Sequence, residues 1–249
     1  MQAIGVGYES NNKYKIMDND GRQLFMAEEE TGFCWRCCCK TKRPFNMHIK
    51  DNTGEQVLTF TRKWTWCECA WFDFCLEDVE VWSGKHDREE GGGTLIGKVT
   101  QPKGGGCFYP TTFISDKEGT PQLSVKGPFC IGKFCDSTFE VLGSDENVVG
   151  TVVRDTKLRD VLSQALTDAD NFHIQFPKDM AIETKATAIA ATMLVDFMFF
   201  EVGGSAQADL ANQSVSFHLC TCYCLGCPMP CVITLGGNNG DGGGGGGGE

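Results

Sequence analysis

Short runs in which apolar and polar residues alternate occupy much of residues 14–154, and acidic turns separate them in pairs. Alternation with a period of two is typical of a strand with one buried face, while Asp, Asn and Gly favour tight turns. We therefore predict hairpins around the turns Asp18–Gly21, Asp51–Gly54, Asp116–Gly119 and Gly143–Glu146. The strands predicted beside these turns are Tyr14–Met17 with Gln23–Met26, Asn46–Lys50 with Gln56–Thr61, Thr112–Ser115 with Gln122–Lys126, and Thr138–Leu142 with Asn147–Arg154.

Two further runs, Glu77–Val81 and Thr94–Gln101, also have the character of strands. Repeated hairpins of this kind predict a mainly β fold, either an antiparallel sheet or a barrel. Helical spacing of apolar residues is scarce by comparison. It predicts a short helix over Leu158–Leu166 and a longer one from about Ala181 to Glu201, with Asp179 as the N-cap of the longer helix.

The longer helix is apolar around its whole circumference, at positions that include Ala186, Ile189, Met193, Leu194, Phe197 and Phe200. The 19 residues of Ile182–Phe200 approach the length needed to span a bilayer. Asp196 argues against that, because a carboxylate inside a span costs about a few kcal/mol. A helix enclosed by a β-barrel would show the same pattern. A membrane-spanning helix and an enclosed helix therefore both stay open.

The chain of 249 residues carries 22 basic and 33 acidic residues, which gives a net charge of −11. We expect no nucleic-acid partner, because this charge is repelled by a phosphate backbone. No basic and apolar leader opens the chain, so we expect it in the cytosol, where thiols stay reduced. Residues 8–202 are predicted to form the globular domain, between an N-terminal extension at 1–7 and a flexible Cys-rich and Gly-rich tail at 203–249.

The 15 cysteines need an explanation other than disulfides in that compartment. One group lies beside Lys40, Lys42 and Arg43, which suits acylation near an anionic membrane surface. A second group lies among the aromatic residues Trp64, Trp66, Trp71, Phe72 and Phe74. These rings suit the headgroup region of a membrane, although they would equally pack onto a barrel. The predicted acyl acceptors are Cys37, Cys38, Cys39, Cys67 and Cys69.

Zinc is a third interpretation of the cysteines. Cys34 and Cys37 have the spacing of zinc ligands, as do Cys224 and Cys227. The two pairs are remote in sequence, so we do not expect zinc there. If the long helix spans a membrane, the segment Cys220–Cys231 would face the exterior, where disulfides would form.

An acidic segment, Asp168–Asp179, lies directly before the long helix. Asp168, Asp170 and Asp179 stand at positions 1, 3 and 12 of a twelve-residue window, which are ligand positions of an EF-hand calcium loop. His173 replaces the glycine required at position 6. A weak calcium site is one interpretation, and a capped turn between a helix and a strand is the other.

No catalytic set is recognisable in the sequence. The four histidines lack the His-Glu-x-x-His pairing, and neither a nucleophile elbow nor a phosphate-binding loop is present. We therefore expect no hydrolytic or redox chemistry.

Eight stretches run in a characteristic order through residues 8–201: Asn12–Gly21, Phe25–Glu29, Arg43–Phe45, Ile96–Gln101, Phe139–Val141, Val148–Gly150, Thr167–Pro177 and Val195–Glu201. The run Asp-Ala-Asp-Asn-Phe that begins at Asp168 and the run Asp-Phe-Met-Phe-Phe-Glu that begins at Asp196 are the most specific. Through these stretches the chain resembles the phospholipid scramblase family.

The resemblance implies a Tubby-like antiparallel β-barrel of about twelve strands that encloses a hydrophobic C-terminal helix. It also implies calcium-activated movement of phospholipids between leaflets, in both directions and without ATP. The expected location is the cytosolic face of the plasma membrane, or a single pass with the C-terminus outside if the helix spans. The calcium ligands that carry over are Asp168, Asp170, Asn171, Gln175 and Asp179.

Two departures from the family pattern bear on these expectations. The glycine usual in the calcium segment is His173 here, and the five-Cys acylation motif is reduced to Cys67, Cys69 and Cys75. One helix cannot form a polar path alone, so a scramblase of this kind is expected to form homo-oligomers on a phospholipid membrane. The alternative is a non-catalytic, membrane-tethered lipid-binding or adaptor protein whose helix is buried in the barrel.

Overall fold

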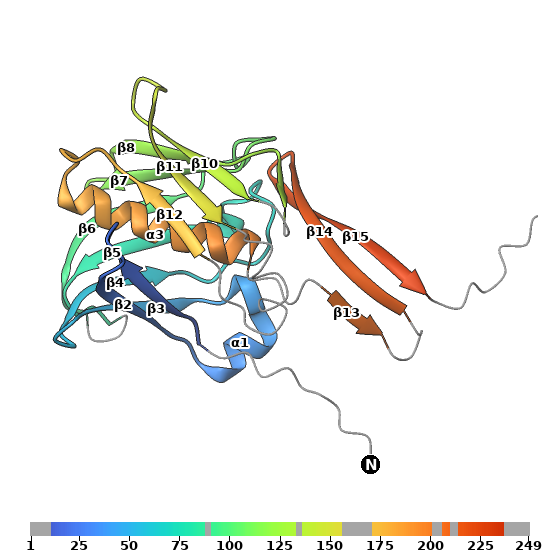
Figure 1. The fold of residues 1–249 in the computed structure, drawn as a ribbon, viewed down its shortest axis with the longest axis horizontal. Coiled ribbons are helices and arrows are strands. Elements are labelled where there is room, and N and C mark those ends of the chain that lie inside the picture. Colours follow the sequence, from blue (N-terminus) through green and yellow to red (C-terminus); the bar gives the residue numbers. More distant parts are fainter. Residues whose placement is uncertain are drawn as a thin grey trace, which may run out of the picture.

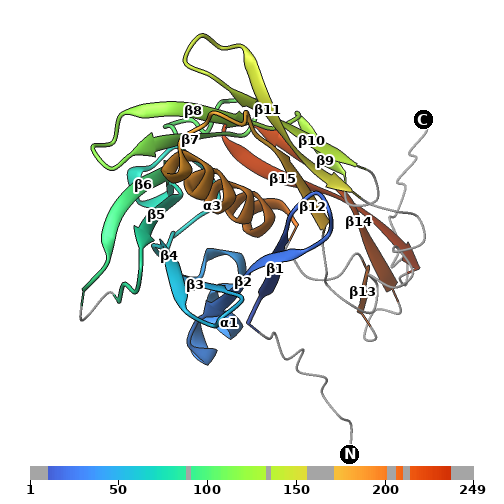
Figure 2. The ribbon, with the colours of Figure 1, turned by 60° about the vertical axis from the view of Figure 1, so that its left-hand side comes forward.

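The structure is a computed structural model that describes residues 11–87, 91–132, 136–155, 171–200, 206–209 and 214–236. Its main feature is an eleven-stranded antiparallel sheet. The strands from β1 to β12 follow one another in chain order across this sheet, except that β9 belongs to a second sheet. The strands are β1 (Lys13–Met17), β2 (Gln23–Glu30), β3 (Phe45–Asp51), β4 (Gln56–Arg62), β5 (Asp78–Ser83), β6 (Thr94–Thr100), β7 (Thr111–Asp116), β8 (Pro121–Lys126), β10 (Ser137–Leu142), β11 (Val148–Asp155) and β12 (Asn171–Gln175). Figures 1 and 2 show this sheet curving around a helix.

The four acidic turns connect β1 to β2, β3 to β4, β7 to β8 and β10 to β11, as predicted. The first turn shows why. Asp18 Oδ1 accepts hydrogen bonds from the backbone N–H groups of Asp20 at 2.9 Å and Arg22 at 2.8 Å, and Gly21 takes a φ of 77°. Local side-chain chemistry therefore sets the hairpins, and the predicted strand pairs are confirmed.

The enclosed helix is α3 (Ile182–Phe199), which packs against β5, β6 and β7. Its predicted extent is confirmed, whereas Asp179 is not its N-cap. Ala181 holds that position and makes no side-chain capping bond. Of the six apolar positions singled out in the sequence, one is half-buried, Ile189, and five are buried: Ala186, Met193, Leu194, Phe197 and Phe200. The expectation of a mainly β fold with a C-terminal hydrophobic helix is thus confirmed.

Close approach and internal hydrogen bonds fit α3 to the sheet. A Cβ on Gly97 of β6 would lie 2.2 Å from Thr187 Oγ1, so only glycine allows this contact. The two buried hydroxyls are satisfied within the helix, since Thr187 donates to Glu183 O at 2.8 Å and Thr192 donates to Ala188 O at 3.0 Å. No helix among the described residues is long and apolar enough to cross a membrane.

Two buried arginine–carboxylate pairs lie beside the C-terminal half of α3. Arg43 Nε and Nη2 donate to the two oxygens of Glu29 at 2.6 and 2.9 Å. Arg62 Nη2 and Nε donate in the same way to Glu77 at 2.7 and 2.8 Å. Such two-pronged pairs are the strong form of an ion pair. Both guanidinium groups face the ring of Phe197, Arg43 at 4.8 Å and Arg62 at 5.7 Å from its centroid.

The charge state of the first pair follows from its surroundings. Burial alone would raise the pKa of the Glu29 carboxyl, but the hydrogen bonds and charge of Arg43 outweigh burial and lower that pKa. Glu29 therefore stays ionised at neutral pH. Nearby, Tyr14 of β1 donates to Asp196 of α3 at 2.6 Å. The carboxylate that argues against a membrane span is thus hydrogen-bonded to the first strand of the sheet.

A second sheet contains β9 (Cys130–Gly132), β13 (Ala206–Asp209), β14 (Ser214–Cys224) and β15 (Cys227–Gly236). The flexible tail predicted from residue 203 therefore contains a long hairpin, which projects beyond the main sheet in Figure 1. Leu225 and Gly226 turn the hairpin with φ values of 48° and 76°, the combination of a type I′ turn. The helix predicted over Leu158–Leu166 lies outside the described residues.

Tyr223 anchors this hairpin to the core. Its ring lies 6.2 Å from that of Phe199 of α3, and its hydroxyl accepts a hydrogen bond from Gln101 Nε2 at 2.9 Å. Burial raises the pKa of Tyr223 to about 12, so the phenol stays neutral. This contact could not be predicted, because the Cys, Gly and Pro residues around Tyr223 give no clear strand pattern.

We predict that Arg43→Met destabilises the protein by about 3–5 kcal/mol, because Glu29 would stay buried without its cation. The measurement is the free energy of unfolding from urea denaturation. The matched control is Arg22→Met, since Arg22 is exposed and pairs with Asp20 only at 3.4 Å. The control should change stability by less than about 1 kcal/mol. Equal losses in the two variants would contradict the role given to the buried pair.

Candidate functional site

The short helix α1 (Phe33–Cys39) presents a row of thiols to solvent. Cys34, Cys37 and Cys38 are exposed and Cys39 is half-buried, all as free cysteines. A helix this short is not stable alone. The buried side chain of Arg36 holds it in place by donating to Thr31 O and, at 2.6 Å, to Asn11 Oδ1. The buried Arg36 therefore fixes the position of the exposed thiols on α1.

Beside α1, the connection between β4 and β5 exposes five large aromatic side chains: Trp64, Trp66, Trp71, Phe72 and Phe74. Trp66 is 63% exposed and Phe74 58% exposed. The ring of Trp35 on α1 lies 5.8 Å from that of Trp64, which lies 4.4 Å from that of Trp66. We call these six residues, the five above with Trp35, the aromatic surface. Apolar side chains gathered in this way mark an interaction site.

The aromatic surface rests on an ordered support. The backbone N–H of Trp66 donates to Phe74 O at 3.3 Å, and a disulfide joins Cys67 to Cys75. A 3-10 turn, η2 (Asp73–Cys75), lies within this segment. Trp71 Nε1 donates to Leu225 O at 2.5 Å, which ties the surface to the tip of the β14–β15 hairpin.

A surface hollow of about 350 Å³ is lined by Trp64, Trp66 and Phe74 together with the charged residues Lys63, Asp73, Glu77 and Asp78. The charges around it are mixed. Lys63 is 2.9 Å from Asp78 and 3.6 Å from Glu80, and the hydrogen bond to Asp78 raises the pKa of Lys63. Lys63, the one positive charge among the described residues that line the hollow, is therefore matched by nearby carboxylates. Attraction to a membrane at this surface would come from its aromatic rings more than from net charge.

The structure separates the predicted acyl acceptors into two groups. Cys37, Cys38 and Cys39 are free on α1 beside the aromatic surface. Cys67 and Cys69 form disulfides with Cys75 and Cys227, so these two thiols are not free in this structure. The sequence signal that the prediction overlooked was Trp35, which stands within the first cysteine group and joins it to the second.

The predicted calcium segment is only partly described. Asp168 and Asp170 lie outside the described residues, while Asn171 and Gln175 begin and end β12. Four residues of extended strand separate their Cα atoms by about 13 Å. Gln175 accepts a bond from Thr151 at 3.4 Å, and Asp179 is exposed beyond the strand. The structure therefore does not bring Asn171 and Gln175 together.

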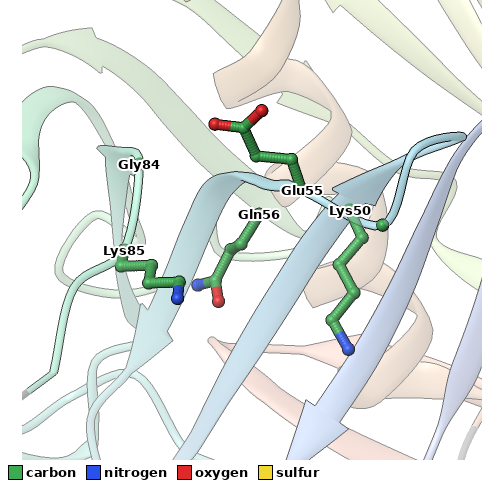
Figure 3. Close-up of a pocket in the computed structure, with 6 residues that line it drawn as sticks. Lys50, Glu55, Gln56, Gly84 and Lys85 are labelled. Atoms are coloured by element: carbon green, nitrogen blue, oxygen red, sulfur yellow. The ribbon is translucent and has the colours of Figure 1, made fainter.

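Another surface hollow, of about 470 Å³, lies beside the turn that connects β3 to β4 and is shown in Figure 3. Lys85 and Gln56 point toward one another there, and Glu55 points away. Lys50 is paired with Glu28 at 2.6 Å, so among the described residues that line the hollow Lys85 is the cation available to attract an anion. Neither zinc pair considered in the sequence forms a metal-ligand group among the described residues, and Cys227 is bonded to Cys69.

Comparison with known proteins gives one consistent result. The family model described as Scramblase matches residues 1–202. Phospholipid scramblase 1 of Homo sapiens is 37% identical over 204 residues, which are 81% of this chain and 60% of that protein. Phospholipid scramblase 2 of Homo sapiens is 37% identical over 200 residues, 78% of this chain and 62% of that protein. The chain thus spans about three fifths of the length of these relatives. No solved structure matches it significantly.

We predict that Trp64→Ala combined with Trp66→Ala weakens binding to phosphatidylcholine vesicles by at least about tenfold, since each buried indole contributes on the order of 1.5–3 kcal/mol. Sedimentation with sucrose-loaded vesicles measures this. Met17→Ala is the matched control, because Met17 is an exposed apolar residue at the first hairpin turn. Because the charges at the surface are paired, binding should change little between low and physiological salt. Equal binding by the double variant and the parent protein would refute the assignment.

Proposed function

Because the chain belongs to the phospholipid scramblase family, we propose that it moves phospholipids between the leaflets of a membrane, in response to calcium and without ATP. The match along residues 1–202 confirms the resemblance inferred from the motifs. The observation that carries the proposal is the aromatic surface beside the free thiols of α1. It combines rings suited to the headgroup region with positions for acyl chains.

Docking is the first step of the proposed activity. Rings such as Trp66 and Phe74 enter the headgroup region at the cytosolic face of the plasma membrane, and acyl chains on Cys37, Cys38 or Cys39 make attachment lasting. Inserted rings spread the lipids of one leaflet and lower the barrier to headgroup passage. Several copies acting together would widen the disturbed region, which accounts for the homo-oligomer expected of a single-helix protein.

We assign the response to calcium to the segment Asp168–Asp179, which would bind the ion. A protein with a net charge of −11 is repelled by anionic lipid, and an ion held by the aspartates reduces that repulsion. The segment also has a mechanical connection to α3, because Phe172 of β12 packs edge-on against Phe200 at 5.8 Å. We further propose that β1 and β12, which both contact α3, are the neighbouring edges of a Tubby-like barrel.

A second function is favoured by one observation, the burial of α3. A helix held by Tyr14 and faced by two buried arginines is well suited to a static core. In that case the protein is a membrane-tethered lipid-binding or adaptor protein that moves no lipid. The two functions share the docking surface and differ in lipid movement alone.

Reconstitution into liposomes with a leaflet-specific fluorescent lipid separates the two. We expect calcium-dependent loss of lipid asymmetry, and we expect the combined substitutions Asp168→Ala, Asp170→Ala and Asp179→Ala to weaken the calcium response by at least about tenfold. The matched control replaces three exposed turn carboxylates, Asp20, Glu55 and Glu118, with alanine and should respond like the parent protein.

Three results would count against parts of this proposal. No lipid movement at any protein load, with vesicle binding intact, favours the adaptor. A calcium response that survives the aspartate substitutions removes Asp168–Asp179 as the calcium segment. An equal loss in the control would show that the response follows overall charge instead of this segment.

A further inference from the structure

Four free thiols gather where the C-terminal hairpin meets the strand β9. Cys130 lies on β9, Cys220 and Cys222 on β14, and Cys231 on β15. The register places Cys222 opposite Cys130 and Cys220 opposite Cys231. Residues two apart on a strand share a face, and opposite residues of neighbouring strands share it too. All four thiols, which we call the thiol cluster, therefore lie on one face of this sheet.

The distances within the thiol cluster suit a metal ion. The Sγ atoms of Cys130, Cys220 and Cys222 all lie within 4.8 Å of one another. Cys222 Sγ is 3.1 Å from that of Cys130 and 3.5 Å from that of Cys231. In a tetrahedral site with zinc–sulfur bonds of about 2.3 Å, the sulfur atoms lie about 3.8 Å apart. Small side-chain rotations thus bring the thiols to ligand positions.

The face that carries the cluster is open to an arriving ion. On β14 the intervening residues Thr221 and Tyr223 are buried on the opposite face, toward the core. Cys130 is exposed, and the other three thiols are half-buried. Because the hairpin rests on the core through Tyr223, the thiols stand on a supported backbone that β9 and β14 hold in register.

We propose that one zinc ion binds the four thiols that converge here: Cys130, Cys220, Cys222 and Cys231. A set of four thiolates without carboxylate or water ligands is characteristic of structural zinc. This set differs from the Cys-x-x-Cys pairs visible in the sequence, because β9 contributes a ligand from about 90 residues before the hairpin. The proposal is independent of lipid movement.

A disulfide accounts for the cluster less well than a metal. Two disulfides, Cys130–Cys222 and Cys220–Cys231, would use all four thiols, but Cys222 Sγ lies almost as close to Cys231 as to Cys130. The structure bonds Cys67 to Cys75 and Cys69 to Cys227, whereas all four thiols of the cluster are free. Cys222 contacts both Cys130 and Cys231, which is the arrangement of a shared ligand set and not of a single pair.

The bound ion would fasten the hairpin to the rest of the fold. Zinc bridging β9, β14 and β15 holds the backbone on either side of Tyr223, whose ring packs on Phe199 of α3. Binding energy at a structural zinc site acts directly as folding energy. The hairpin should therefore depend on zinc for its order.

The test is elemental analysis of the full chain, purified with a phosphine reductant and without chelator. We expect about one zinc ion per chain. Cys222→Ser, which removes the central thiol, should lose that zinc. Cys107→Ser is the matched control, since Cys107 is an exposed free thiol outside the cluster, and it should keep zinc.

A second measurement keeps the proposal testable if Cys222→Ser misfolds. Zinc-stripped parent protein is titrated with Co²⁺, and the absorption spectrum should show intense thiolate-to-cobalt bands that saturate at one equivalent and disappear on adding zinc. Absence of both bound zinc and these bands would overturn the proposal. Zinc retained by a folded Cys222→Ser variant would overturn it too, as would a Cys130–Cys222 disulfide found by mass spectrometry in parent protein that was alkylated at lysis and purified without reductant.

Discussion

The helix α3 is held to the sheet by the contact of Phe197 with two buried arginines, Arg43 and Arg62. Each guanidinium is bound by both oxygens of a carboxylate and faces the same ring. An uncompensated buried charge is costly, so removing α3 from the sheet would uncover two ion pairs as well as a large apolar face. Through these contacts the sheet and the helix require one another.

This constraint decides how the protein can meet a membrane. A helix that is packed against β5, β6 and β7 and hydrogen-bonded through Asp196 is already committed to the protein interior. We therefore expect lipid to be contacted by exposed side chains such as Trp66 and Phe74, and not by α3. The hairpin connects the two regions, because Tyr223 packs on α3 while Leu225 accepts a hydrogen bond from Trp71.

Much of the fold could be predicted because its signals are local. Asp18 and Gly21 specify a turn from neighbouring residues, and alternation specifies the strands on either side. The β14–β15 hairpin could not be predicted, because its stability comes from distant partners, β9 and the buried Tyr223. The aromatic surface and the thiol cluster could likewise be predicted only in part. The cysteines and tryptophans were identifiable, but the contact of Trp35 with Trp64 and the approach of Cys130 to Cys222 arise only from tertiary pairing.

From these contacts we expect α3 to keep its place inside the sheet when the protein is on a membrane. Spin labels carried by noncanonical residues at Ile182 of α3 and Glu140 of β10, two exposed positions, allow the distance between helix and sheet to be measured by pulsed electron resonance. We predict one distance distribution that is unchanged between free and vesicle-bound protein, with and without calcium. A second, longer distance on vesicles would show that α3 leaves the sheet at the membrane.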